Sequence, residues 1–239
     1  MLAEGEKPSL NKDGFDATYS WSVFNAMKHI VKGELNVTSL DSAINSFDTA
    51  YPANALHLYF TSNHDENSWS KADYGTMPGK THAPFAVLTQ TIKNNVPLIY
   101  GSQEEPVLRA IRFFDKDTIV FNKFNRAAFY KKLLLLRKYH PALASNASFI
   151  RLKTNDDKNV YAYLRYMNKK FVVVLLNLSN GKHTIKIKEL PSFVANTENT
   201  FDVMKRISQK NILNSLFKLD SWGYTIVMDD DAVIEKELK

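Results

Sequence analysis

The chain changes character near residue 145, and this change limits what it can fold into. Upstream, short apolar segments alternate with segments whose apolar residues recur every three or four positions. Downstream, β-branched and aromatic segments follow one another with only turn residues between them. Strands separated by helices indicate a parallel sheet, whereas consecutive strands indicate an antiparallel one. The sequence therefore predicts an α/β unit at residues 1–145 and an all-β antiparallel sandwich at residues 146–239.

The first unit is expected to contain four helices with two strands between them. The helices are predicted at residues 21–31, 38–47, 84–93 and 126–138, and the strands at residues 56–60 and 96–100. In the second helix, Thr38 and Asp41 resemble a capping box with Thr38 as the N-cap. Pro97 is expected near the start of its strand, where a missing N–H group does least harm.

The second unit is expected to contain strands at residues 160–166, 171–176, 184–188 and 224–228. Asn168-Lys169 and Asn180-Gly181 are the clearest turns between them. Tyr161 and Tyr163 share one strand face, which favours a half-buried sheet surface over a sugar-binding one.

Composition excludes several classes of protein. The 239 residues are 44% hydrophobic, which is typical of a globular fold, and no apolar run approaches the roughly 20 residues of a membrane helix. No cysteine is present, so disulfides and thiolate metal sites are excluded. The net charge of +6 comes from scattered lysines, which favours a solvated surface over a nucleic-acid site. The first residues lack a secretory signal, and the localisation stays open.

Polar residues follow the strand predicted at residues 56–60. Asn63, His64 and Asp65 come directly after its end, and the carboxyl ends of parallel strands are where α/β enzymes place their chemistry. The alternatives are a helix-capping role for Asp65 and an ordinary loop position for His64, and a functional role is favoured for both.

Asn63-His64-Asp65 resembles the last short motif of the α-amylase family of glycoside hydrolases. Residues 1–4, ending in Glu4, resemble the motif that carries the family's general acid/base, and residues 14–21 resemble the strand and loop that follow it. Residues 97–104 resemble the final barrel strand and residues 130–143 the closing helix. The resemblance implies a partial (β/α)8 TIM barrel, strands 5–8 with their helices, followed by a C-terminal antiparallel β-sandwich.

The resemblance also implies roles for individual side chains. Glu4 would be the general acid/base and Asp65 the stabiliser of the transition state in a retaining hydrolysis of α-glucosidic bonds. Asn63 and His64 would bind sugar hydroxyls, and Trp69 would either stack on a sugar ring or cover the loop. For Glu4 the alternative is a solvated terminal glutamate, with Glu6 as the replacement acid.

One departure from the family is large. Its nucleophile is an aspartate two positions after an arginine, in a segment upstream of the glutamate motif, and Glu4 leaves no such segment here. The chain is therefore expected to be inactive alone on its α-glucan oligo- or polysaccharide substrates. Two alternatives remain open: a half-enzyme complemented by a separate N-terminal polypeptide, and a non-catalytic glucan-binding protein that uses the sandwich.

No cofactor is needed for this chemistry, and no metal ligand is predicted. The family often binds a structural calcium ion, but its usual ligands belong mostly to the absent half. That absence also predicts that the inner faces of Leu56, Leu58, Phe60, Leu98 and Ile99 are uncovered. Residues before about 146 are then expected to be digested by proteases before the sandwich is.

Overall fold

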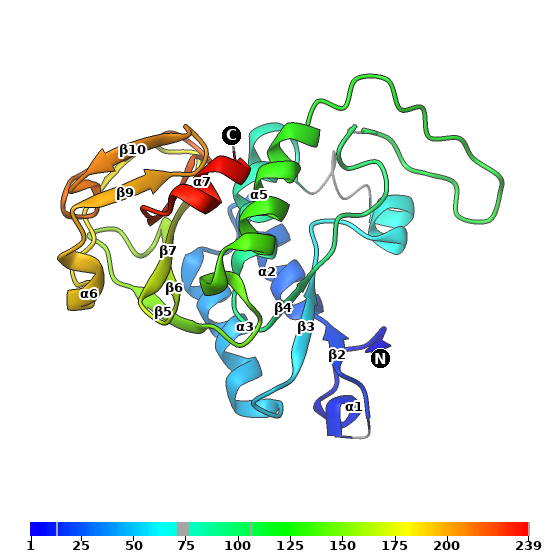
Figure 1. The fold of residues 1–239 in the computed structure, drawn as a ribbon. Coiled ribbons are helices and arrows are strands. Elements are labelled where there is room, and N and C mark those ends of the chain that lie inside the picture. Colours follow the sequence, from blue (N-terminus) through cyan, green and yellow to red (C-terminus); the bar gives the residue numbers. More distant parts are fainter. Residues whose placement is uncertain (13, 71–76, 106, 239) are drawn as a thin grey trace.

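The computed structural model describes residues 1–12, 14–70, 77–105 and 107–238. Its described residues form a four-stranded parallel sheet, a six-stranded antiparallel sheet and a two-stranded sheet. Helices lie between the parallel strands and the antiparallel sheet, and a long loop after β4 extends away from both (Figure 1).

The parallel sheet has the strand order β1-β2-β3-β4. Its strands are β1 (Leu2–Ala3), β2 (Ala17–Tyr19), β3 (Leu56–Tyr59) and β4 (Asn95–Pro97). Tyr19 pairs with Leu58 and Tyr59 pairs with Pro97, so all four carboxyl ends meet at one edge. β4 is shorter than expected, and Pro97 ends it instead of starting it. The chain leaves the sheet after the Leu98 N–H group donates to the carbonyl of Tyr59.

The four expected helices are present. They are α2 (Trp21–Val31), α3 (Val37–Ala50), α4 (His82–Thr91) and α5 (Ala127–Tyr139), and a short α1 (Pro8–Lys12) precedes them. The predicted capping box is wrong, because the N-cap of α3 is Asn36, whose side chain accepts from the Thr38 N–H group at 2.9 Å. Asp41 instead binds Arg151 at 3.0 Å.

The antiparallel sheet has the order β10-β9-β12-β7-β6-β5. Its strands are β5 (Ser148–Leu152), β6 (Val160–Met167), β7 (Lys170–Asn177), β9 (Asn199–Asp202), β10 (Ile207–Lys210) and β12 (Tyr224–Asp229). β8 (His183–Ile185) pairs separately with β11 (Phe217–Leu219). The predicted turn between β6 and β7 is confirmed, with Asn168 and Lys169 both left-handed at φ of 51° and 67°. β5, β9, β10 and β11 were not anticipated.

Shorter helical segments connect these elements. They are η1 (Glu66–Ser70), η3 (Gly79–Thr81), η4 (Pro141–Leu143), α6 (Ser192–Ala195), η5 (Ile212–Asn214) and α7 (Ala232–Leu238).

The antiparallel sheet is buried on both faces, and the alternation of side chains along β6 shows this. Tyr161 and Tyr163 belong to the apolar core that contains the helices, whereas Ala162 and Leu164 belong to the core under β8 and β11. Tyr161 and Tyr163 are 1% and 0% exposed. They are therefore part of the protein interior, and glucan cannot stack on them.

Of the five residues expected to have uncovered inner faces, Leu56, Leu98 and Ile99 are partly exposed. The expectation is wrong for Leu58 and Phe60. Their exposed fractions are 5% and 0%. Phe60 stacks on Phe24 with ring centroids 5.0 Å apart, and the edge of Trp21 closes the other side at 5.1 Å. Trp21 and Phe24, at and near the start of α2, thus cover the face of Phe60 that the absent barrel strands were expected to cover.

The boundary expected between residues 145 and 146 falls between η4 and the first residue of β5, Ser148. One apolar core nevertheless contains residues from α2, α3, α4 and α5 together with residues from β6, β7 and β12. The division into two domains stays a prediction, because the two units share that core.

Candidate active site at the carboxyl ends of the parallel strands

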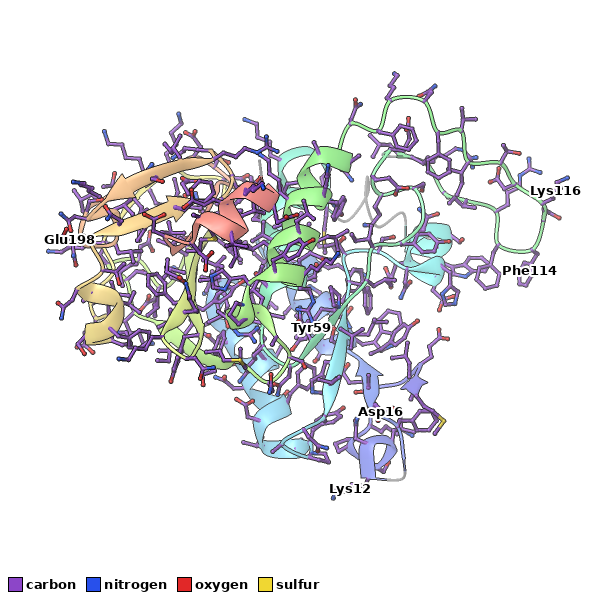
Figure 2. All side chains as sticks on the ribbon, in the orientation of Figure 1. Lys12, Asp16, Tyr59, Phe114, Lys116 and Glu198 are labelled. Atoms are coloured by element: carbon purple, nitrogen blue, oxygen red, sulfur yellow. The ribbon has the colours of Figure 1, made fainter. Side chains whose placement is uncertain are left out.

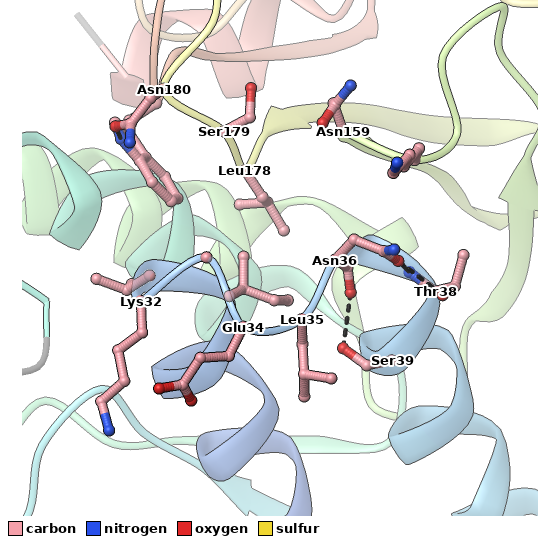
Figure 3. Close-up of a pocket in the computed structure, with 15 residues that line it drawn as sticks. Lys32, Glu34, Leu35, Asn36, Thr38, Ser39, Asn159, Leu178, Ser179 and Asn180 are labelled. Atoms are coloured by element: carbon pink, nitrogen blue, oxygen red, sulfur yellow. Dashed lines mark hydrogen bonds between the residues drawn. The ribbon is translucent and has the colours of Figure 1, made fainter.

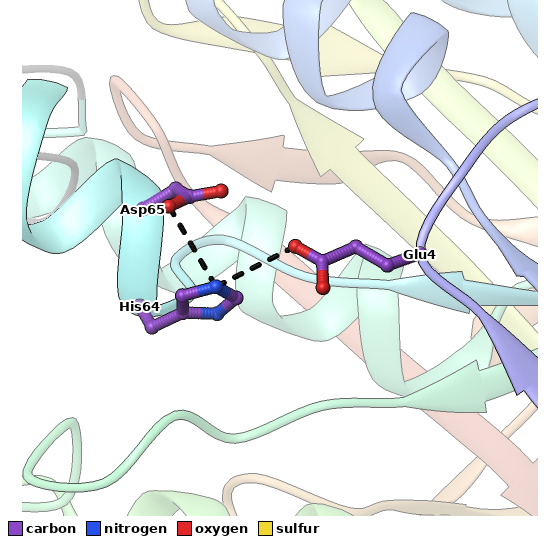
Figure 4. Close-up of side chains that lie close together, drawn as sticks. All are labelled: Glu4, His64 and Asp65. Carbon is purple, nitrogen blue, oxygen red and sulfur yellow. Dashed lines mark ion pairs between the residues drawn. The ribbon is translucent and has the colours of Figure 1, made fainter.

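Glu4, His64 and Asp65 come together at the edge where the parallel strands end. Glu4 directly follows β1, and the other two follow β3. The His64 Nε2 atom lies 3.5 Å from Glu4 Oε1 and 3.6 Å from Asp65 Oδ1 (Figure 4). Two carboxyl groups separated by 61 positions in the chain therefore face one imidazole.

The turn that presents His64 and Asp65 is held by Asn63. Its Oδ1 atom accepts from the Glu66 N–H group at 2.8 Å, and its carbonyl accepts from the Asn67 N–H group at 2.9 Å. Asn63 is only 1% exposed, so it supports the turn from below. Its Nδ2 atom and the Ser62 Oγ atom are buried without a hydrogen-bond partner in the part of the chain that the structure describes.

The three site side chains are open to solvent on this chain. The exposed fractions of Glu4, His64 and Asp65 are 51%, 44% and 39%. Tyr19, at the end of β2, is the buried neighbour of this cluster. Burial raises the pKa of Tyr19, and the charges of Glu4 and Asp65 raise it further. Its hydroxyl therefore keeps its proton near neutral pH. The sequence signal for Tyr19 was its place at the end of a neighbouring parallel strand.

Glu6, the replacement acid considered above, is engaged elsewhere. Its carboxylate accepts from the Ser22 N–H group at 2.7 Å and from the Ser22 hydroxyl, at the first turn of α2. Burial raises the pKa of Glu6, although these hydrogen bonds act in the opposite direction. Carboxylates at a helix N-terminus stabilise the helix, which gives Glu6 a structural use.

Aromatic side chains continue the site beyond His64. Trp69, on η1, is 61% exposed and lies 5.3 Å from Phe113 and 6.1 Å from Phe114, measured between ring centroids. Phe113 also stacks beside His64 at 6.2 Å. The two phenylalanines were missed because they lie in a segment without periodicity. The available signal was a pair of adjacent phenylalanines in a long segment without a predicted helix or strand.

Glu4, His64 and Asp65 could also share a metal ion, since one ligand atom from each lies within 4.8 Å of the others. No other such group occurs within the described residues. Calcium takes six to eight oxygen ligands, and an imidazole with two carboxylates does not match that cage. The structural calcium of the family is therefore not placed here.

A cavity of about 520 Å³ lies between the α2–α3 connection and the antiparallel unit, and none of the site residues line it (Figure 3). Some of its polar side chains bind one another. Asn36 caps α3, and Asn180 accepts from the Trp222 indole N–H group at 2.6 Å. It contains no grouping of reactive side chains comparable to the strand-end cluster.

Comparison with known proteins identifies relatives of both halves. The family model of the cyclo-malto-dextrinase C-terminal domain matches residues 156–227. Cyclomaltodextrin glucanotransferases from Niallia circulans and from Bacillus sp. (strain 6.6.3) are each 31% identical over 150 residues, 59% of this chain and 19% of theirs.

Solved structures show the same fold across nearly the whole chain. A maltogenic α-amylase from Thermotoga neapolitana has a TM-score of 0.68 at 17% identity, covering 95% of this chain and 51% of that one. An α-amylase from Geobacillus thermoleovorans, complexed with acarbose, has a TM-score of 0.72 at 14% identity, covering 97% and 53%. The chain matches the C-terminal part of an α-amylase family enzyme.

The chain thus spans about half the length of these α-amylase family structures and a fifth of the curated relatives. Another solved neighbour, covered to 55%, is in complex with maltose. No helix among the described residues has both the length and the apolar character that crossing a membrane requires.

Proposed function

We propose that this chain is the C-terminal half of an α-amylase-type glycoside hydrolase whose complete form cleaves α-glucosidic bonds of starch-like glucans with retention. The observation that carries the proposal is the meeting of Glu4, His64 and Asp65, with the two carboxylates 3.5 and 3.6 Å from His64 Nε2. One relative is named a cyclomaltodextrin glucanotransferase and one solved neighbour is in complex with maltose, and both names agree with this substrate class.

Each side chain has a role that its chemistry suits. Glu4 protonates the departing glycosidic oxygen and later activates water, which a carboxyl group at a strand tip can do. Asp65 accepts hydrogen bonds from sugar hydroxyls that tighten as the ring distorts, so it stabilises the transition state more than the bound substrate. His64 lies between them and orients a hydroxyl. The attacking carboxylate comes from the missing half, so the chain alone forms no covalent intermediate.

In this proposal the parallel sheet is strands 5–8 of a (β/α)8 barrel. Two features favour this assignment. The edge strands β1 and β4 each have only one partner in the described sheet. Ser62 Oγ and Asn63 Nδ2, buried beneath the site without a partner among the described residues, are the kind of groups that a neighbouring element satisfies.

Two measurements on the chain test the proposal. Soluble starch should release no reducing sugar, because the nucleophile is absent. Maltoheptaose should bind, and Asp65→Asn should weaken that binding about tenfold, since a hydrogen bond to a charged group is lost. Asp48→Asn is the matched control, because it removes the same charge from an exposed carboxylate that pairs with Lys93. Reducing sugar that Glu4→Gln abolishes would contradict the missing nucleophile, and equal affinity of Asp65→Asn and wild type would contradict the site.

A second candidate is complementation by a separate N-terminal polypeptide. The observation in its favour is a groove of about 490 Å³ that is lined mostly by apolar parts of Ile99, in the segment after β4, and of α5. Leu134 of α5 lines it and is 45% exposed. Co-expression with a polypeptide carrying the four preceding barrel strands should give a soluble complex that hydrolyses starch. A complex without activity, or no complex, would count against this candidate.

The structure offers less support for a glucan-binding sandwich. Tyr161 and Tyr163, the aromatic residues that suggested it, are buried against the helices. Amylose affinity retained by residues 146–239 alone would restore this alternative.

A further inference from the structure

Three exposed aromatic side chains form a continuous surface beside the candidate site. Trp69, Phe113 and Phe114, together called the aromatic ledge, are 61%, 43% and 84% exposed. The rings of Phe113 and Phe114 meet edge to face at 4.9 Å, and both contact Trp69. Large apolar side chains gathered in the open are unusual in a soluble protein and mark a binding surface.

The aromatic ledge is continuous with the catalytic cluster. Phe113 and His64 lie nearly parallel, with an angle of 28° between their rings. The Nε2 edge of His64 faces Glu4 and Asp65. A chain molecule whose reacting bond sits at Glu4 therefore passes over His64 and Phe113 without leaving the protein surface.

The loop that carries the two phenylalanines is fixed to the segment that carries Trp69. The Ser68 hydroxyl donates to the carbonyl of Ile111 at 2.8 Å, and the Ile111 N–H group donates to Asn67 Oδ1 at 2.9 Å. Asn67 is 1% exposed, so this second contact starts from the protein interior. Phe113 lies only two residues after Ile111, so these two hydrogen bonds also restrict its position.

Two carboxylates brace the same loop internally. Asp117 accepts from the Arg109 guanidinium at 2.7 Å and from the Arg112 N–H group at 2.9 Å, and these contacts lower the pKa of Asp117. Glu105 accepts from the backbone N–H groups of residues 122–124 at the other end. The loop extends from the body of the protein, with Phe114 and Lys116 at its far end (Figure 2). Its shape is set before any ligand arrives, which lowers the entropy cost of binding.

We propose that the aromatic ledge binds glucosyl rings of the substrate beside the bond being cleaved, and that Phe113 and Trp69 are specificity-determining residues. This inference rests on the proposed function of the Glu4–His64–Asp65 cluster. The apolar C–H face of a pyranose ring packs on the electron-rich face of an aromatic ring, and its hydroxyl edge stays in water. A groove of about 260 Å³ between Trp69 and residues 110–115 gives one ring a place beside the phenylalanines.

Trp69 supplies a direct readout. Of the three tryptophans, Trp222 is 7% exposed and Trp21 is partly buried in the core, so Trp69 is the accessible one. Maltoheptaose should protect Trp69 fluorescence from acrylamide quenching, and Trp69→Phe should abolish that change. Phe113→Ala should weaken maltoheptaose binding roughly fivefold. Phe121→Ala is the matched control, because Phe121 is exposed on the same loop but packs on Phe124. All these side chains are on the surface, and circular dichroism verifies that each variant folds.

The outcomes separate the aromatic ledge from the cluster. If Asp65→Asn weakens binding while Phe113→Ala and Trp69→Phe bind as wild type does, the ledge is overturned and the proposed function stands. If the ledge variants weaken binding and Asp65→Asn does not, the ledge stands and the cluster fails. Absence of any protection by maltoheptaose overturns the ledge. Protection by neutral phosphatidylcholine vesicles in its place would assign the surface to a membrane.

Discussion

Buried polar groups are hydrogen-bonded on one side of this molecule, whereas on the other side some of them lack a partner among the described residues. Where the helices meet the antiparallel sheet, the guanidinium of Arg165 is buried and donates to the backbone carbonyls of five residues. These are Thr91, Ile92, Ala144, Ala147 and Ser148, at 2.5 to 3.3 Å. At the carboxyl ends of the parallel strands, Ser62 and Asn63 keep buried atoms without partners among the described residues, and Glu4 is half exposed.

The difference separates stability from chemistry. The junction with the antiparallel sheet is complete within this chain, so it should carry most of the folding energy. The strand ends present reactive groups with little packing around them, and their loss should leave the fold intact. Substitutions on each side test whether this contrast is correct.

The largest effect is expected at Arg165. Arg165→Met leaves buried carbonyls without donors and should reduce the free energy of unfolding by about 3–4 kcal/mol. Arg165→Lys should recover only part of the loss, because one ammonium group cannot reach acceptors on both sides. Urea denaturation followed by circular dichroism measures both. A change below about 1 kcal/mol for Arg165→Met would mean that the junction does not depend on this residue.

A smaller, pH-dependent effect is expected at Asp229. Burial would raise the pKa of Asp229, but hydrogen bonds from His140, the Phe171 N–H group and Lys170 lower it below its ordinary value of 3.8. A depressed folded pKa contributes stability above the unfolded pKa, and this contribution is lost as the pH falls through the folded pKa.

Asp229→Asn should therefore cost about 2 kcal/mol at pH 6, and the difference from wild type should disappear as the pH falls below the folded pKa. Thermal unfolding at a series of pH values measures it. A difference that stays constant down to pH 2 would show that Asp229 acts through packing and not through its charge.

Tyr163→Phe should have an effect of about 1 kcal/mol. The Tyr163 hydroxyl bonds the Thr91 hydroxyl at 2.6 Å, and the Thr91 hydroxyl also donates to the carbonyl of Val87. Removing the Tyr163 hydroxyl therefore leaves the Thr91 hydroxyl with one partner. Tyr166→Phe, on the same strand and partly exposed, is the control. Equal urea midpoints for Tyr163→Phe and wild type would show that this hydrogen bond between β6 and α4 adds nothing.

The smallest effect on global stability is expected at Glu105. Its pKa is lowered chiefly by the hydrogen bond from the Phe124 N–H group, so the carboxylate is the anchor of the loop. Glu105→Gln should leave the thermal midpoint unchanged while residues 107–125 are cut faster in limited proteolysis. In wild type the loop should resist the protease at concentrations that cut the Glu105→Gln variant. Early cuts inside α3 or α4 would instead indicate that the α/β unit is unstable without the other barrel strands.

Local patterns predicted much of this fold. Helices α2 to α5 carry apolar stripes, and β3, β6, β7 and β12 carry β-branched or aromatic runs that are visible without tertiary context. The cap of α3 was misassigned because Asn36 and Thr38 are both good caps, and only the backbone angles choose between them. β9, β10 and β11 are short and partly polar, and their pairing depends on partners far away in the sequence.

The candidate site was predictable in part, because its residues follow strands that local patterns or motifs indicate. Parallel strands bring their carboxyl ends to one edge, so the meeting of Glu4 with His64 and Asp65 followed from the strand order. The buried position of Asn63 did not follow, because a side chain that caps its own turn has the same sequence signature as one that faces a ligand. Phe113 and Phe114 were missed because their placement depends on hydrogen bonds to Asn67 and Ser68, more than 40 positions away.

The guanidinium of Arg165 is separated from its acceptors at Thr91 and Ile92 by 74 and 73 positions. A growing polypeptide exposes those acceptors first, and they remain hydrated until β6 has left the ribosome. The α/β segment therefore cannot complete its native contacts until β6 has been synthesised.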